Sequence, residues 1–269
     1  MMLLTPVQLL SGKSGSFTPL AIFGGMAKGW WRLNALPDGI AAVQNPFATV
    51  DTTSGATTIS QLTNLVSPGT GDLAQTTKAN QPLAEYNFFN NRSVLRISAT
   101  NQGMSANLAL NGSVWWVLVW HRDSTFQSSL NVVTQYQDGF FAYQNTGGCA
   151  PLLADSPATG NRAGQESPVS TYSTIASVSN GVWRAVVSEF DAAGDQIRLD
   201  FNAGAVNASA AWSGSLSNSD RVSIGMTGNN AYYSHPCRLA EIICGTGVIS
   251  AAQKNDLYRY LRVEHANFF

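Results

Sequence analysis

Glu189 and Asp191 are two acidic residues two positions apart, and their type and spacing suit catalysis better than those of any other pair in this chain. Residues i and i+2 of a β-strand point to the same face, so a strand through Phe190 would present both acids together. Glycoside hydrolysis uses two such carboxylates, about 5–5.5 Å apart for retention and about 6.5–9.5 Å for inversion. Ala192-Ala193-Gly194 follows, which is typical of a strand running into a turn. We therefore expect an outward-facing strand end here.

Other catalytic arrangements are not found in the sequence. Its three histidines are His121, His235 and His265, and none has the His-x-x-x-His spacing of a zinc site. No Gly-x-Ser-x-Gly segment, the turn that presents a nucleophilic serine, occurs either. The sequence therefore predicts no catalytic residue and a protein that is not an enzyme.

Carbohydrate binding fits the residue types better. Sugars present apolar C–H faces and hydroxyl groups, so their sites combine exposed aromatic rings with amide or charged groups. Two segments have this composition: a hairpin around Asp138-Gly139 and the loop before the last strand. The candidate ligand-binding residues are Tyr136, Tyr143, Asn229, Asn230, Tyr232 and Tyr233. Aromatic side chains that only anchor a loop are the alternative.

Calcium is the cofactor that the sequence suggests for consideration. Asp191, Asp195, Asp220 and Asn229-Asn230 supply the oxygen ligands that Ca²⁺ prefers. No compact D-x-D-x-[DN]-G loop gathers them, so we expect no metal and no other cofactor. The three cysteines, Cys149, Cys237 and Cys244, cannot all pair, and we expect buried free thiols.

Alternating apolar residues and turn signals predict a β-rich chain with one helix at its end. The helix is expected from Ser250 to about His265, because Ser250 and Gln253 form a capping box and Leu257, Tyr258 and Leu261 share a helical face. Three prolines predict a long loop over residues 146–170. The expected strands after residue 85 are 93–98, 105–110, 113–121, 131–136, 139–144, 171–178, 182–190, 196–202, 205–212, 220–226 and 237–244.

The end of the chain resembles a known family. Arg238-Leu239-Ala240-Glu241-Ile242-Ile243 and the capped helix with Leu257, Tyr260 and Leu261 resemble the ending of laminin-G-like, concanavalin-A-type jelly-roll domains of phage and bacterial surface proteins. Further matches follow the family's order: Asn80–Leu83, Val94–Ile97, Ser113–Trp120 and Trp183–Asn202. The resemblance implies an all-β, antiparallel two-sheet jelly-roll sandwich. The family's glucanases carry a third acid in an E-x-D-x-x-E pattern, which is missing after Asp191.

The amino-acid composition limits the classes of partner that this chain can bind. The chain has 269 residues, a net charge of −1 and only 12% charged residues, so it offers no basic surface for nucleic acid. No run of 18 apolar residues occurs, which excludes a membrane-spanning helix. We expect residues 1–27 to form an arm for attachment or oligomerisation, because Gly-rich hinges flank apolar pieces, and residues 28–269 to form the lectin-like domain. The alternative is that these apolar pieces cross the back of the domain itself.

The functional expectation combines these points. It is a non-enzymatic surface protein of a virion or phage-like particle, synthesised in a bacterial cytoplasm, that binds host cell-surface carbohydrate as a spike, fibre or decoration module. Its expected partners are other particle proteins through the N-terminal arm, host surface glycan and further copies of itself. A purely structural capsid or tail component and a secreted bacterial carbohydrate-binding module are the alternatives.

Overall fold

The computed structural model describes most of the chain, and the account that follows is confined to that part. The described residues are 18–33, 48–51, 57–89, 92–98, 101–122, 139–144, 150–156, 160–166, 171–175, 181–201, 206–211, 219–225 and 237–265. Their helical elements are α2 (Pro19–Phe23), η2 (Gly24–Met26), η4 (Lys78–Asn80) and α3 (Ala251–Glu264).

Strands make up the rest of the described architecture. The first eight are β1 (Ala27–Arg32), β2 (Ala48–Asp51), β3 (Thr58–Leu62), β4 (Leu73–Ala74), β5 (Leu83–Phe89), β6 (Arg92–Ile97), β7 (Met104–Leu110) and β8 (Val114–Arg122). The others are β9 (Gly139–Gln144), β10 (Ala150–Ser156), β11 (Gly160–Glu166), β12 (Thr171–Ile175), β13 (Trp183–Asp191), β14 (Gln196–Phe201), β15 (Val206–Ala211), β16 (Ser219–Ile224) and β17 (Cys237–Thr246).

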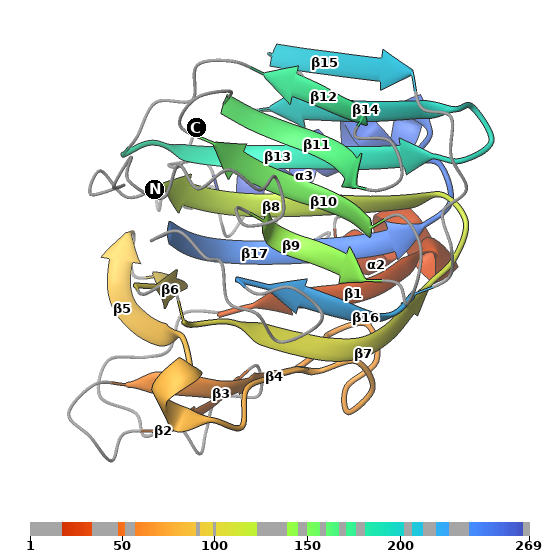
Figure 1. Cartoon of the computed structure of the whole chain (residues 1–269). Coiled ribbons are helices and arrows are strands. Elements are labelled where there is room, and N and C mark those ends of the chain that lie inside the picture. The colour runs from red at the N-terminus through yellow and green to blue at the C-terminus, as the bar shows by residue number, and fades with distance from the viewer. Residues whose placement is uncertain are drawn as a thin grey trace, which may run out of the picture.

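The strands pair antiparallel and fold into two layers (Figure 1). The first layer runs β1-β17-β8-β13-β14-β15, and β6 pairs with the beginning of β17. The second layer runs β7-β16-β9-β10-β11-β12. The expected all-β jelly-roll sandwich with one short C-terminal helix is therefore confirmed.

The side chains of β8 point alternately to the two faces of the first layer, and both faces are buried. Trp116, Leu118 and Trp120 enter the core between the two layers. Trp115 and Val117 point the other way, into a second core beneath the helices. Because successive side chains of a strand point to opposite faces, a continuous apolar run fits only a doubly covered strand.

Helix α3 covers the first layer on the side away from the second, as Figure 1 shows. Ser250 accepts a hydrogen bond from the Gln253 amide and the Gln253 side chain accepts one from the Ser250 amide, which confirms the capping box. Leu257, Tyr258 and Leu261 are buried against the sheet, as expected. No described helix is long and apolar enough to cross a membrane.

The prediction of a loop over residues 146–170 is wrong. Strands β10 and β11 occupy most of this segment and pair with one another over their whole length. Pro151 is tolerated because it is the second residue of β10, before the pairing with β9 begins at Leu152. The predicted strand 131–136 lies outside the described residues. Cys237 and Cys244 are free and buried, as expected, and Cys149 is not among the described residues.

The described part of the predicted N-terminal arm lies on the sandwich itself. Thr18 caps α2 by accepting a hydrogen bond from the Ala21 amide. Phe23 is buried, with its ring centroid 4.2 Å from that of Trp115. Gly245 allows this close packing, since a Cβ there would lie 2.3 Å from the Met26 carbonyl oxygen. The division of the chain at residue 27 remains a prediction, and residues 1–17 lie outside the described part.

Candidate functional site

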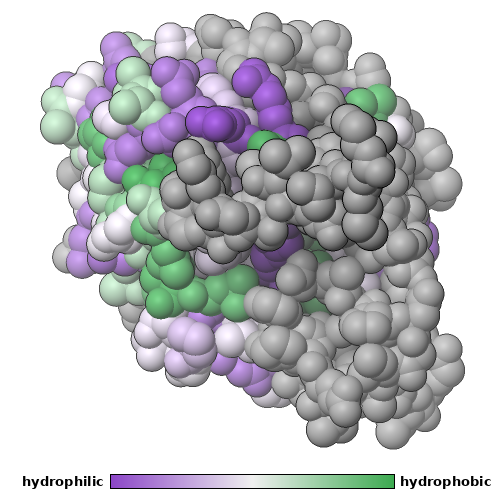
Figure 2. Space-filling view, turned by 180° about the vertical axis from the view of Figure 1, so that it is seen from behind, coloured by the Kyte–Doolittle hydropathy of each residue, from purple (hydrophilic) through white to green (hydrophobic). Residues whose placement is uncertain are grey.

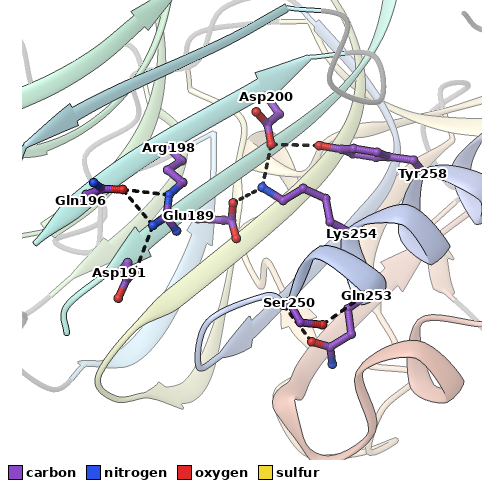
Figure 3. Close-up of polar contacts among 9 residues, drawn as sticks. All are labelled: Glu189, Asp191, Gln196, Arg198, Asp200, Ser250, Gln253, Lys254 and Tyr258. Atoms are coloured by element: carbon purple, nitrogen blue, oxygen red, sulfur yellow. Dashed lines mark hydrogen bonds and ion pairs between the residues drawn. The ribbon is translucent and has the colours of Figure 1, made fainter. Parts of the chain in front are cut away.

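A lysine joins two carboxylates beneath the first turns of α3 (Figure 3). The Lys254 ammonium donates to Asp200, at 2.8 Å, and to Glu189. Tyr258, one helical turn further on, donates its hydroxyl proton to the same Asp200 oxygen at 2.9 Å. Burial works against the charged lysine, but the two carboxylates outweigh it and raise the pKa of Lys254. The helix is thereby tied to β13 and β14 by charge.

One oxygen in this cluster has no partner. Glu189 is buried, and its Oε1 makes no hydrogen bond although Oε2 contacts Lys254. Its cross-strand neighbour Trp115 is also buried, and the indole N–H is likewise unbonded. Unsatisfied buried polar atoms are uncommon in native proteins and mark either ordered water or a functional group. Glu189 is therefore the described acid best suited to a chemical role.

Asp191 serves the turn that follows the strand. Its carboxylate accepts from the Gly194 amide at 2.8 Å and from Arg198 at 3.2 Å. Asp195 follows with a positive φ of 49°, a conformation that Asp tolerates in turns. The expectation that the strand end faces outward is wrong, because Glu189 and Asp191 are both buried. The turn that the sequence predicted after Asp191 is present.

A second carboxylate cluster lies beneath the last turns of α3. Glu241 is buried and accepts from Trp30 Nε1 at 2.6 Å and from the Tyr260 hydroxyl at 2.5 Å. The accepting oxygen, Oε1, also lies 3.8 Å from an Arg32 guanidinium nitrogen, and the other oxygen, Oε2, lies 2.6 Å from His265 Nε2. Burial opposes ionisation, yet the His265 hydrogen bond and the Arg32 charge lower the pKa of Glu241 to about 2.

The described residues hold no group of three or more His, Cys, Asp or Glu side chains that could bind a metal ion.

The second layer brings three polar residues side by side. Asn107 of β7 pairs with Arg221 of β16, and Arg221 pairs with Gln144 of β9. Directly opposed residues share a face of an antiparallel sheet, and the next row along, Ala106 with Val222, belongs to the core. The register therefore aligns Asn107, Arg221 and Gln144 across three strands, and we call these residues the polar row.

The outer face of the second layer differs from the covered face of the first layer. Both described α-helices pack on the first layer, and Figure 1 shows α3 on the far side of the molecule from β9, β10 and β16. Asn107 is exposed. Ser223, two residues after Arg221 in β16, is buried and its hydroxyl has no hydrogen-bond partner. Asn, Arg and Gln are residue types that supply the hydrogen-bond donors and acceptors that hydroxyl-rich ligands require.

Five of the six residues predicted to bind ligand are not among the described residues, so their placement together stays a prediction. Tyr136, Asn229, Asn230, Tyr232 and Tyr233 lie outside the described residues. Tyr143 lies in β9, opposite the core residue Val222 rather than in the polar row. Its strand neighbour Gln144 occupies the row instead, and sequence reasoning missed it together with Asn107 and Arg221. The alternation of Arg221 and Ser223 with Val222 and Ile224 was the available signal.

Comparison with known proteins gives a fold and no family. No family model matches the chain, and neither does any curated protein. Among solved structures, an arabinofuranosidase complexed with arabinofuranosyl-α-1,2-xylobiose matches with a TM-score of 0.58 and 13% identity, over 90% of this chain and 64% of that one. A GH54 α-L-arabinofuranosidase soaked with a cyclic sulfate inhibitor matches with a TM-score of 0.54 and 13% identity, over 89% and 59%. Trypanosoma rangeli sialidase matches with a TM-score of 0.56 and 10% identity, over 96% and 38%.

These neighbours correct one expectation. The prediction that the protein is not an enzyme is contradicted, because its sandwich is similar to that of glycoside hydrolases. The chain spans less than two thirds of each of these neighbours, and the identities of 10–13% establish the fold alone. Activity and substrate are therefore matters for proposal.

Proposed function

We propose that this protein recognises carbohydrate through the outer face of its second layer. The polar row of Asn107, Arg221 and Gln144 is the observation that carries the proposal, because the strand register aligns these residues across three adjacent strands and Asn107 is exposed. The sandwich shared with an arabinofuranosidase and a sialidase supports it. Tyr136, Tyr143, Asn229, Asn230, Tyr232 and Tyr233 remain residues that the sequence proposes as ligand contacts.

A screen of immobilised glycans tests the proposal. We expect the wild-type protein to bind a defined set of glycans and the Asn107→Ala/Arg221→Ala variant to lose that binding with an unchanged melting temperature. A matched control is Arg198→Ala, which removes a guanidinium from the helix-covered face of the first layer. Binding that survives the double variant, or that disappears equally in the control, would place the site elsewhere.

Glycoside hydrolysis is the second candidate function, and one observation favours it. Glu189 and Asp200 contact the same ammonium group, so their carboxylates lie close together, and Glu189 Oε1 is unbonded. Two neighbouring carboxylates are what this reaction requires. For catalysis at this pair, Lys254 would have to leave the space between them.

The release of reducing ends from polysaccharide separates the two candidates. For hydrolysis, we expect release by the wild-type protein, loss of release in Glu189→Gln, and retention in Glu264→Gln, whose carboxylate pairs with Arg32 at the other end of α3. Melting curves must show that both variants remain folded. No release from any polysaccharide would remove this candidate and leave glycan recognition standing.

The setting is proposed from the sequence resemblance. We propose a location on the surface of a virion or phage-like particle, with synthesis in a bacterial cytoplasm, host surface glycan as the target, and other particle proteins and further copies of the chain as partners through the N-terminal segment. Purified particles that contain this protein, probed with a specific antibody, would support the proposal. Recovery only as a free secreted protein would favour the alternative of a bacterial carbohydrate-binding module.

A further inference from the structure

An apolar surface covers α2, η2 and the beginning of α3, and the Lys28 ammonium, which donates to the Gly25 carbonyl oxygen at 2.8 Å, lies at its border. Its exposed members are Leu20, Ala21, Gly25, Val248, Ala251 and Ala252. Leu20 is 37% exposed and Val248 is 45% exposed, which is high for such large apolar side chains. Figure 2, which views the molecule from behind, shows green hydrophobic atoms gathered at the left of this side. We call this surface the α2–α3 patch.

The patch is continuous because α2, η2 and α3 contact one another. The Gln253 side-chain amide donates to the Ile22 carbonyl oxygen at 3.3 Å and lies 3.5 Å from the Met26 sulfur. A Cβ placed on Gly247 would lie 3.1 Å from Met26 Cε. Glycine and alanine between the larger side chains allow another chain to approach closely. Contiguous exposed apolar surfaces of this kind mark interaction sites.

The residues that precede the patch in the chain have a matching character. Thr18, which caps α2, stands two residues before Leu20, so the N-terminal segment leaves the sandwich at the edge of the patch. Residues 1–12 carry no charged side chain and include Leu3, Leu4, Val7, Leu9 and Leu10. Residues 11–16 are glycine and serine with one lysine, which is a linker composition.

We propose that the α2–α3 patch of one copy of this chain receives the segment Leu3–Leu10 of a second copy. In a two-fold dimer each copy gives its segment to the other and receives one in return. Each N-terminal segment then begins at the interface and has the partner's patch within reach. A net charge of −1 gives little repulsion between copies. This inference rests on the proposed assembly role of the N-terminal segment and names the surface that receives it.

Light scattering during size-exclusion chromatography tests the contact. We expect a dimer for the wild-type protein, and monomers for the chain lacking residues 1–10 and for Leu20→Glu/Val248→Glu, each with an unchanged circular dichroism spectrum. Val263→Glu is the matched control, because this valine is 50% exposed near the other end of α3, and the control should stay dimeric. A wild-type monomer at every concentration, or a dimer that survives both changes, would overturn the proposal.

A labelled synthetic peptide of residues 1–12 tests the docking itself. It should bind the chain that lacks residues 1–10, and this binding should disappear when Leu20→Glu/Val248→Glu is added. Peptide binding by a truncated chain whose full-length form is monomeric would mean that the segment docks on its own sandwich, which contradicts the second-copy contact. Glycan binding measured on the same variants should not change, so a failure here is distinguishable from a failure of the proposed recognition site.

Discussion

The helix-covered side and the open side of the sandwich use polar residues differently. Beneath α3, nearly every charged group has a partner from the same chain: Glu241 with His265 and Arg32, and Lys254 with Glu189 and Asp200. On the outer face of the second layer, Asn107 is exposed and aligned with Arg221 and Gln144. Charge on the covered side therefore holds the helix to the sheet, whereas the polar row of the open side is the place where we propose that a ligand binds.

The largest expected effect breaks the covered side. Glu241→Gln removes the buried carboxylate that His265 and Arg32 share and leaves Arg32 with Glu264 alone, and removing one partner of a buried ion pair typically costs about 3–5 kcal/mol. Urea unfolding should show this loss in the free energy of unfolding. Glu264→Gln, whose side chain is 26% exposed, should cost about 1 kcal/mol or less. Equal losses in the two variants would mean that burial of Glu241 has no special weight.

Removing the apolar contact of the same helix should have a comparable or smaller effect. Leu261 is fully buried between α3 and the sheet, so Leu261→Ala should lower the free energy of unfolding by about 2–5 kcal/mol through the cavity it leaves. Glycan binding should remain at a temperature where the variant is folded. A variant that melts with the wild type would show that α3 does not stabilise the sandwich.

Low pH should destabilise the helix-covered side through protonation of Glu241. The pKa of Glu241 is about 2 in the folded protein and about 4.5 without these contacts, so its stabilisation is fully present above pH 4.5 and is lost as the pH falls towards 2. Each pKa unit corresponds to about 1.36 kcal/mol, so the total loss is about 3 kcal/mol. Thermal melts between pH 6 and pH 2 should show a steeper loss for the wild type than for Glu241→Gln. Parallel curves would contradict the assignment.

Local signals were enough to predict much of the fold. The capping box of Ser250 and Gln253 predicts where α3 begins. The apolar run through Trp115 and Trp116 predicts strand β8. Strands β10 and β11 were missed because Pro151 was taken to exclude a central strand, although its place near the start of β10 lets the ladder form around it. Prolines thus limit strands less when they lie at strand ends.

The polar row could not be predicted because no local pattern contains it. Asn107, Gln144 and Arg221 are brought together only by the register of three strands, and that register depends on the core residues on the opposite face. The aromatic residues chosen from the sequence follow a compositional rule, and composition does not reveal strand register, although a shift of one residue moves a side chain to the other face of a sheet.

The central claim is that the open face recognises carbohydrate. The variant that tests it, Arg221→Ala, should also show the smallest change in stability. Titration of an identified glycan into Arg221→Ala and into Glu241→Gln, each at a temperature where it is folded, compares the two sides directly. Arg221→Ala should change the free energy of unfolding by about 0.5 kcal/mol or less and weaken binding at least tenfold, whereas Glu241→Gln should bind like the wild type. Unchanged affinity in Arg221→Ala together with lost affinity in Glu241→Gln would contradict the account.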